Sequence, residues 1–130
     1  MDNKIIDNLK NVREILKDQD SWTKGKPARD IVGNPISSIS KEATCWCLYG
    51  AIIKSSIEKF SPRLDMPGGK IEDDTIDYLN YFLPEYKFRH IVNFNDWVTT
   101  KHEDVMKLLD DAIAQGEVIL DMNQKGQSTS

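Results

Sequence analysis

The sequence of 130 residues has few of the motifs that identify a function. It has no HExxH metal motif, no Gly-x-Ser-x-Gly nucleophile motif and no dinucleotide-binding fingerprint. These absences exclude the common zinc-protease, serine-hydrolase and nucleotide-binding signatures. We therefore predict no cofactor, and the remaining indications of function are less specific.

A dense basic block is also absent, although the charge is unevenly distributed. The net charge is −4, made up of +2 over residues 1–60 and −6 over residues 61–130. An acidic half repels a phosphate backbone and attracts basic surfaces. This balance argues against a nucleic-acid partner and leaves a protein partner or a small molecule.

Long hydrophobic runs and cysteines are scarce. The longest apolar stretch, residues 43–53, is too short to span a membrane, and no signal peptide is recognisable. Cys45 and Cys47 are two residues apart, so a disulfide between them would be strained. Reduced thiols are typical of the cytoplasm, which is the predicted location.

Periodic apolar residues predict four helices. The first, over residues 3–18, repeats Ile5, Leu9, Val12 and Leu16 at helical spacing. The others are expected to run from Ser40–Glu42 to Phe60, from Asp73 or Asp74 to Pro84, and from a capping box at Thr100 to Gly116.

The remaining segments are predicted as loops, with one ambiguous stretch. Residues 86–94 alternate like a strand, which residues 117–121 could pair with, but a helical turn is the alternative. Trp22, Ile31 and Ile36 are expected to hold the long loop 19–41 against the core. The predicted fold is mostly α: a compact four-helix single domain over residues 1–122, with long ordered loops and at most one small strand pair. Residues 123–130 are predicted to be a disordered polar tail.

The apolar helix predicted around residues 45–47 contains Gly50. Glycine inside a helix costs about 1 kcal/mol relative to alanine. We therefore expect another backbone to approach closely beside Gly50 and Ala51.

The two cysteines suggest two kinds of chemistry. Metal binding would combine Cys45 and Cys47 with His90 and His102. On a helix, however, positions two apart point about 200° from each other, so the thiolates would not share an ion. We predict no metal site.

A nucleophilic cysteine is the second possibility. Cys47 or Cys45 would act with His90 as the base, oriented by Asn95 or Asp96. The competing interpretation is a buried thiol that packs as a small hydrophobic group. The apolar neighbours of Cys47 favour burial.

The stretch Asn93–Trp97 offers a further candidate. Asn95 and Asp96 are suited to bond backbone amides and to fix a turn before the last helix. The alternative is that Asp96 reaches a pocket lined by Trp22 and Trp46. The candidate binding residues are Trp22, Gly25, Trp46, Asp96 and Trp97.

Three short patterns occur in a characteristic order: Trp22-x-x-Gly25, Cys47-x-x-Gly50-Ala51, and Asn95-Asp96 before an apolar helix opened by Asp104-Val105. In this the chain resembles an uncharacterised family of small bacterial and phage proteins, the domain of unknown function 6197. The resemblance covers about residues 5–115, although Ser21, Ile52 and Phe94 depart from the family's usual Gly, Leu and Trp. It implies a shared fold rather than a reaction, and a bacterial or phage-infected cytoplasm.

Two functions follow as hypotheses. The first is a small non-catalytic binding protein, in the role of a phage or prophage accessory, that acts through a protein partner or a small ligand. The second is a cysteine-nucleophile enzyme that uses Cys47 or Cys45 with His90 and Asn95 or Asp96. The lack of a strong catalytic constellation favours the first, and the sequence does not indicate an oligomeric state.

Overall fold

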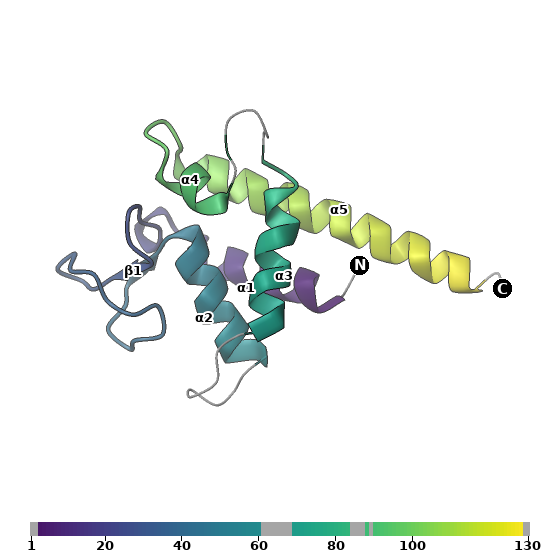
Figure 1. Ribbon diagram of the computed structural model, residues 1–130, viewed down its shortest axis with the longest axis horizontal. Helices are drawn as coiled ribbons and strands as arrows, with labels where there is room; N and C mark the ends of the chain where they lie inside the picture. Colours follow the sequence, from purple (N-terminus) through teal and green to yellow (C-terminus); the bar gives the residue numbers. More distant parts are fainter. Residues whose placement is uncertain (1–2, 61–68, 84–87, 89, 129–130) are drawn as a thin grey trace.

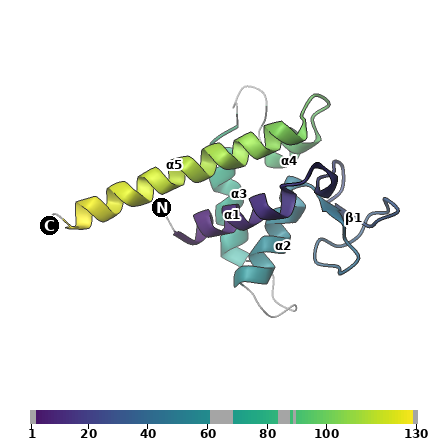
Figure 2. The same cartoon turned by 180° about the vertical axis from the view of Figure 1, so that it is seen from behind.

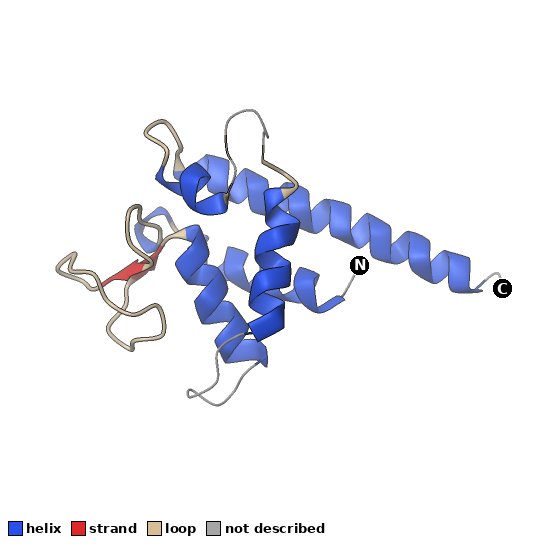
Figure 3. Cartoon of the chain, viewed as in Figure 1, coloured by secondary structure: helices blue, strands red, loops and turns tan. Residues whose placement is uncertain are grey.

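The computed structural model describes residues 3–60, 69–83, 88 and 90–128, with the backbone alone for residues 123–128. The chain is 64% helical and forms one small two-stranded sheet, which confirms the predicted fold class (Figure 3). Its elements are α1 (Asn3–Leu16), the 3-10 turn η1 (Gln19–Ser21), β1 (Ala28–Arg29), β2 (Cys45–Trp46), α2 (Leu48–Phe60), α3 (Gly69–Asn80), α4 (Ile91–Asp96) and α5 (His102–Ser128).

Helix α1 lies at the centre of the helical packing. It crosses α2 and α3, while α5 runs alongside it and extends beyond the other helices (Figures 1 and 2). Ile6, Leu9, Val12 and Leu16 of α1 are almost completely buried. Their spacing puts them on one helical face, so three residues of the predicted stripe build the core, with Ile6 in the place expected for the half-buried Ile5.

Residues 45–47 are not helical, contrary to our prediction. Ala43 N donates to Ser40 O and closes a turn. The chain then extends into β2, which pairs antiparallel with β1 so that Trp46 lies opposite Ala28. Cys47 N donates to Pro27 O at 3.1 Å, and α2 begins only at Leu48. A short apolar run fits a buried strand as well as a helix, and here the backbone of residues 27–29 supplies the strand's hydrogen bonds.

The predicted close approach beside Gly50 is confirmed. A Cβ at Gly50 would overlap the backbone carbonyl of Pro27. The missing side chain therefore allows the loop before β1 to pack directly on the first turn of α2. Ala51, the next residue, is completely buried.

The first loop is held by polar bonds more than by apolar side chains. Arg29 donates to Thr23 Oγ1 at 3.0 Å, to Lys24 O at 3.0 Å and to Gly33 O at 3.1 Å. Trp22 packs against the core, as predicted. Ile31, in contrast, is 85% exposed, because it stands at the tip of a turn that Asp30 closes; its predicted anchoring role is wrong.

The segment predicted as a possible strand contains α4 instead. His90 caps this helix, since its Nδ1 accepts a hydrogen bond from Val92 N at 3.1 Å. Asn80, at the end of α3, accepts from Ile91 N at 3.0 Å. The helical alternative is therefore correct for residues 91–94, and residues 117–121 are helical rather than a strand partner. Residues 84–87 and 89 lie outside the described residues.

Helices α3 and α5 have different limits from those predicted. Helix α3 starts at Gly69, earlier than the expected Asp73 or Asp74, and the predicted loop residues 61–68 lie outside the described residues. The capping interaction of α5 lies one residue further along the chain than predicted, because Asp104 Oδ2 accepts from Lys101 N at 2.8 Å. The capping residues are therefore Lys101 and Asp104 rather than Thr100 and Glu103.

Gly116 does not end α5. It is buried against Ile6 and Tyr78, so it serves as a contact point for α1 and α3 instead of a stop. The helix continues to Ser128, so the backbone of residues 123–128 is helical where we expected a disordered tail. None of the described helices combines the length and apolar character needed to cross a membrane.

A buried polar cluster joins α1, α2 and α3. Asn8 is completely buried and donates to Ser56 Oγ and Thr75 Oγ1, each at 3.0 Å. Its Oδ1 accepts from Ser55 Oγ. Within the described part of the chain, every buried side-chain nitrogen and oxygen has a hydrogen-bond partner. Because each of its polar groups has a partner, this network can be buried without the cost of an unpaired group, and it fixes the register of the three helices.

Candidate functional site

Asn95, near the end of α4, is the centre of a group of hydrogen bonds between distant segments. Its side chain is completely buried. Its Oδ1 accepts from Trp22 Nε1 at 2.6 Å and from Leu48 N at 3.0 Å. One carbonyl oxygen therefore joins the first loop to the free amide end of α2.

The neighbouring groups complete this arrangement. Asn95 Nδ2 donates to Thr23 O at 3.1 Å and to Asp96 Oδ1 at 3.0 Å. The same Asp96 oxygen accepts from Gly25 N at 2.9 Å, where a φ of 84° suits glycine. We call Trp22, Gly25, Leu48, Asn95 and Asp96 the Asn95 cluster.

Asn95 and Asp96 accept hydrogen bonds from backbone amides, which is the role suggested by the sequence. The position of those amides differs from the one expected. The amides that they bind belong to distant residues 25 and 48 rather than to a local turn. Asp96 therefore meets the first loop at Gly25. The side chain of Trp46, expected beside it, is directed elsewhere.

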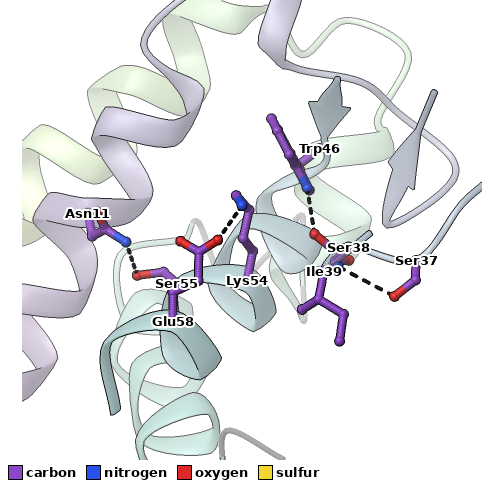
Figure 4. Close-up of polar contacts among 8 residues, drawn as sticks. All are labelled: Asn11, Ser37, Ser38, Ile39, Trp46, Lys54, Ser55 and Glu58. Atoms are coloured by element: carbon purple, nitrogen blue, oxygen red, sulfur yellow. Dashed lines mark hydrogen bonds and ion pairs between the residues drawn. The ribbon is translucent and has the colours of Figure 1, made fainter. Parts of the chain in front are cut away.

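Trp46, in β2, lies between the loop at Ser38 and Lys54 of α2. Its Nε1 donates to Ser38 O at 2.9 Å, and Lys54 Nζ lies 5.2 Å from the centre of its ring (Figure 4). Figure 4 also shows Lys54 paired with Glu58, one turn further along α2. The backbones of Trp46 and Trp22 form a parallel bridge, in which Thr23 N donates to Trp46 O at 3.0 Å.

Cys47 is a buried cap of α2. Its Sγ accepts from Gly50 N at 3.2 Å, and its side chain is 6% exposed. Burial raises the pKa of the Cys47 thiol, although bonds from nearby backbone amides act in the opposite direction. Nucleophilic cysteines need a lowered pKa, so this environment favours a packed thiol.

The remaining partners of the proposed catalytic group are engaged elsewhere. Cys45 is half-buried in β2, with Sγ 4.0 Å from Arg29 O. His90 Nδ1 caps α4, and no hydrogen bond among the described residues joins it to either thiol.

Our argument against metal binding assumed a helix at residues 45–47 and does not apply to the observed strand. In the part of the chain that the structure describes, no three His, Cys, Asp or Glu side chains gather as a metal site. His102, considered above as a possible metal ligand, is half-buried at the start of α5. Its Nε2 lies 2.6 Å from Leu16 O, and its ring lies 6.1 Å from that of Trp22.

Trp97 connects the Asn95 cluster to an open cleft. Its carbonyl oxygen accepts from Lys24 Nζ at 2.6 Å and from Thr100 N at 3.1 Å. Trp97 is 41% exposed, and it lies in the wall of a cleft of about 320 Å³ between α4 and α5. The cleft is lined by Phe82, Leu83, Phe88, Phe94, Trp97, Thr99, Thr100, Asp104, Lys107, Leu108 and Asp111.

The aromatic walls of the cleft meet at right angles. The ring of Phe88 lies 5.4 Å from those of Phe94 and Trp97, with interplanar angles of 86° and 85°. Edge-to-face contacts of this kind favour a defined arrangement of rings. The cleft therefore has a shape set by packing rather than by loose side chains.

Sequence reasoning identified Trp97 but missed the rest of the cleft. Its walls come from residues near 82, 88, 94 and 97, and from a face of α5 that carries Asp104, Lys107 and Asp111. The one signal in the sequence is the spacing of these α5 residues, which places them on one side of the helix. The aromatic residues lie in segments whose meeting depends on the packing of α3, α4 and α5.

Fold and site together define a small helical protein with an open aromatic cleft beside a buried asparagine cluster. The chain belongs to the family of unknown function DUF6197, whose profile matches residues 1–115, so the predicted resemblance is confirmed. The match includes the Asn95 cluster and all the described lining residues of the cleft. No curated protein and no solved structure matches the chain.

Proposed function

We propose that this protein is a non-catalytic binding module and that the aromatic cleft is its ligand site. The observation that carries the proposal is the cleft itself, with Phe82, Phe88, Phe94 and Trp97 in its walls. Ligand sites are concave, mostly apolar and aromatic, with a few polar groups, and begin near 300 Å³. The volume of about 320 Å³ suits a small molecule or one side chain of a partner.

The Asn95 cluster supports the proposal because it prepares the site. Asn95 and Asp96 tie the first loop to α4, and Lys24 holds the carbonyl of Trp97. A site whose walls are already fixed loses less conformational entropy when a ligand binds. On this proposal, the family motifs outside the cleft serve to position it.

The alternative, a cysteine-nucleophile enzyme, has less support. The described lining of the cleft includes neither a cysteine nor a histidine. Cys47 is buried with a raised pKa, and His90 is occupied as a helix cap. Rapid alkylation of Cys47 by iodoacetamide at mildly acidic pH would revive this alternative.

The test is a screen of neutral and charged fragments by ligand-observed NMR. We expect hits on the wild type that weaken in Trp97→Ala. The matched control is Tyr81→Ala, which removes an aromatic side chain that is 83% exposed and lies outside the cleft lining. Hits that persist in Trp97→Ala, or a screen without hits, would overturn the proposal.

A further inference from the structure

The charges around the cleft indicate which ligands it accepts. Its described lining carries the carboxylates of Asp104 and Asp111 and the ammonium group of Lys107. Lys107 Nζ binds Asp111 Oδ2 at 2.7 Å, so this pair is largely neutral. One unbalanced carboxylate, that of Asp104, is left in the described lining.

Asp104 occupies a defined position in the lining of the cleft. It lies in the first turn of α5, and its Oδ2 accepts from Lys101 N at 2.8 Å. This bond fixes the carboxylate group near Thr100, which also lines the cleft. A negative charge in a fixed place beside an apolar wall favours a cationic ligand over an anionic one.

The aromatic walls favour the same charge. The faces of aromatic rings are negative and attract cations, and tryptophan does so most strongly. Alkylated ammonium groups suit such sites because they lose less hydration energy than a bare ammonium group when they leave water. Trp97 and Phe94 supply such rings within the same cleft as Asp104. We propose that the ligand is a small organic cation with an alkylated ammonium group. This proposal rests on the proposed function of the cleft as a ligand site.

This ligand class accounts for both kinds of lining group at once. The alkyl groups would contact the rings, while the positive charge would lie close to the Asp104 carboxylate. A polar substituent on the ligand would meet the hydroxyl groups of Thr99 and Thr100. Among the described lining residues, an anionic ligand would meet the Asp104 carboxylate, and the one cation there, Lys107, is paired with Asp111.

The test compares choline with 3,3-dimethyl-1-butanol, which has the same shape but no charge. Binding to the full chain is measured by NMR titration at physiological salt. We expect choline to bind at least about tenfold more tightly than the neutral alcohol. Equal binding of the two probes, or tighter binding of benzoate, would overturn the cation proposal while leaving the cleft as a ligand site.

Two variants make the test specific to Asp104. In Asp104→Asn the amide oxygen can still accept from Lys101 N, so the helix cap is kept while the charge is lost. We expect this variant to lose most of the preference for choline and to bind the neutral alcohol as before. The control Glu103→Gln removes one charge from the adjacent exposed position and is expected to keep the preference. Equal loss in both variants would overturn the role of Asp104.

A screen in which neither probe nor any other fragment binds would count against the proposed function itself. Binding of neutral fragments at the cleft, without preference for choline, would count against the cation proposal alone. Unchanged thermal midpoints in Asp104→Asn and Glu103→Gln would show that both variants remain folded.

Discussion

Trp22 donates its indole N–H to the side-chain carbonyl of Asn95 across 73 residues of sequence, at 2.6 Å. The first prediction concerns this pair. Trp22→Phe removes one donor, so we expect the free energy of unfolding to fall by about 1 kcal/mol. Asn95→Ala leaves Trp22 Nε1, Leu48 N and Thr23 O without their partner, and we expect a loss of about 2–4 kcal/mol.

Urea unfolding of the two single variants and the double variant measures the coupling between these residues. We expect the double variant to lose less than the sum of the single losses, because the shared bond is removed once. Strict additivity would contradict the assigned bond.

Gly50 gives the second prediction, because a side chain at this position would collide with the backbone of Pro27. In Gly50→Ala the new methyl group meets the carbonyl of Pro27, and we expect a loss of about 1–3 kcal/mol despite the better helix propensity of alanine. The matched variant is Gly116→Ala, where the nearest obstacle is the end of the Ile6 side chain. Its cost should be smaller, because a side chain can shift more easily than backbone.

Urea midpoints of the two glycine variants decide the comparison. A larger loss for Gly116→Ala than for Gly50→Ala would contradict the close contact between Pro27 and α2.

The third prediction is a pH dependence that arises from Cys47. Burial raises the pKa of this thiol in the folded protein, whereas an unfolded thiol titrates near a pKa of about 8.5. Below that pH both states hold the proton, and the stabilisation is fully present. Above it the unfolded chain releases its proton first, so stability falls as pH rises towards the raised folded pKa.

Cys47→Ser removes this titration while keeping a side chain that can cap α2. We expect the thermal midpoint of the wild type to fall more steeply than that of Cys47→Ser between about pH 8 and 10. Cys45→Ser serves as the control for the other thiol. Parallel pH profiles for wild type and Cys47→Ser would argue against the buried position of Cys47.

Asn8 supplies the fourth prediction. Asn8→Ala would leave the buried hydroxyl groups of Ser55, Ser56 and Thr75 with fewer partners, and we expect a loss of about 2–4 kcal/mol. Asn11 is half-buried, and among the described residues its side chain hydrogen-bonds to Ser55 Oγ at 2.9 Å. Asn11→Ala should therefore cost about 1 kcal/mol. Equal losses in the two variants, measured by urea unfolding, would contradict the central position of Asn8.

The parts of the fold that were predictable depend on local patterns. The stripe of α1 gives its helix directly, because Leu9, Val12 and Leu16 recur at helical spacing. Gly50 could be read as a close contact because a glycine inside a helix needs a reason. The strand at residues 45–46 was missed because its hydrogen-bond partners lie near residue 28, which an apolar run does not reveal.

The parts that were not predictable depend on packing between segments. Asn8 looks like a surface residue of an amphipathic helix, and its burial follows from Ser56 and Thr75 on two other helices. Gly116 has the composition of a helix stop, but the contacts with Ile6 and Tyr78 keep the helix continuous. For the site, Asn95 and Asp96 were identified from their order in the sequence, whereas their bonding partners and the aromatic cleft required the assembled helices.

The Asn95 cluster has a consequence for the order of folding. It joins residues 22–25, 48 and 95–96, so its bonds form only after two long stretches of chain have closed. Closing long loops costs entropy before such contacts stabilise the chain. The bonds of Asn95 are therefore expected to form after the rate-limiting barrier to folding. Their strength would then govern how slowly the native protein unfolds far more than how quickly it folds.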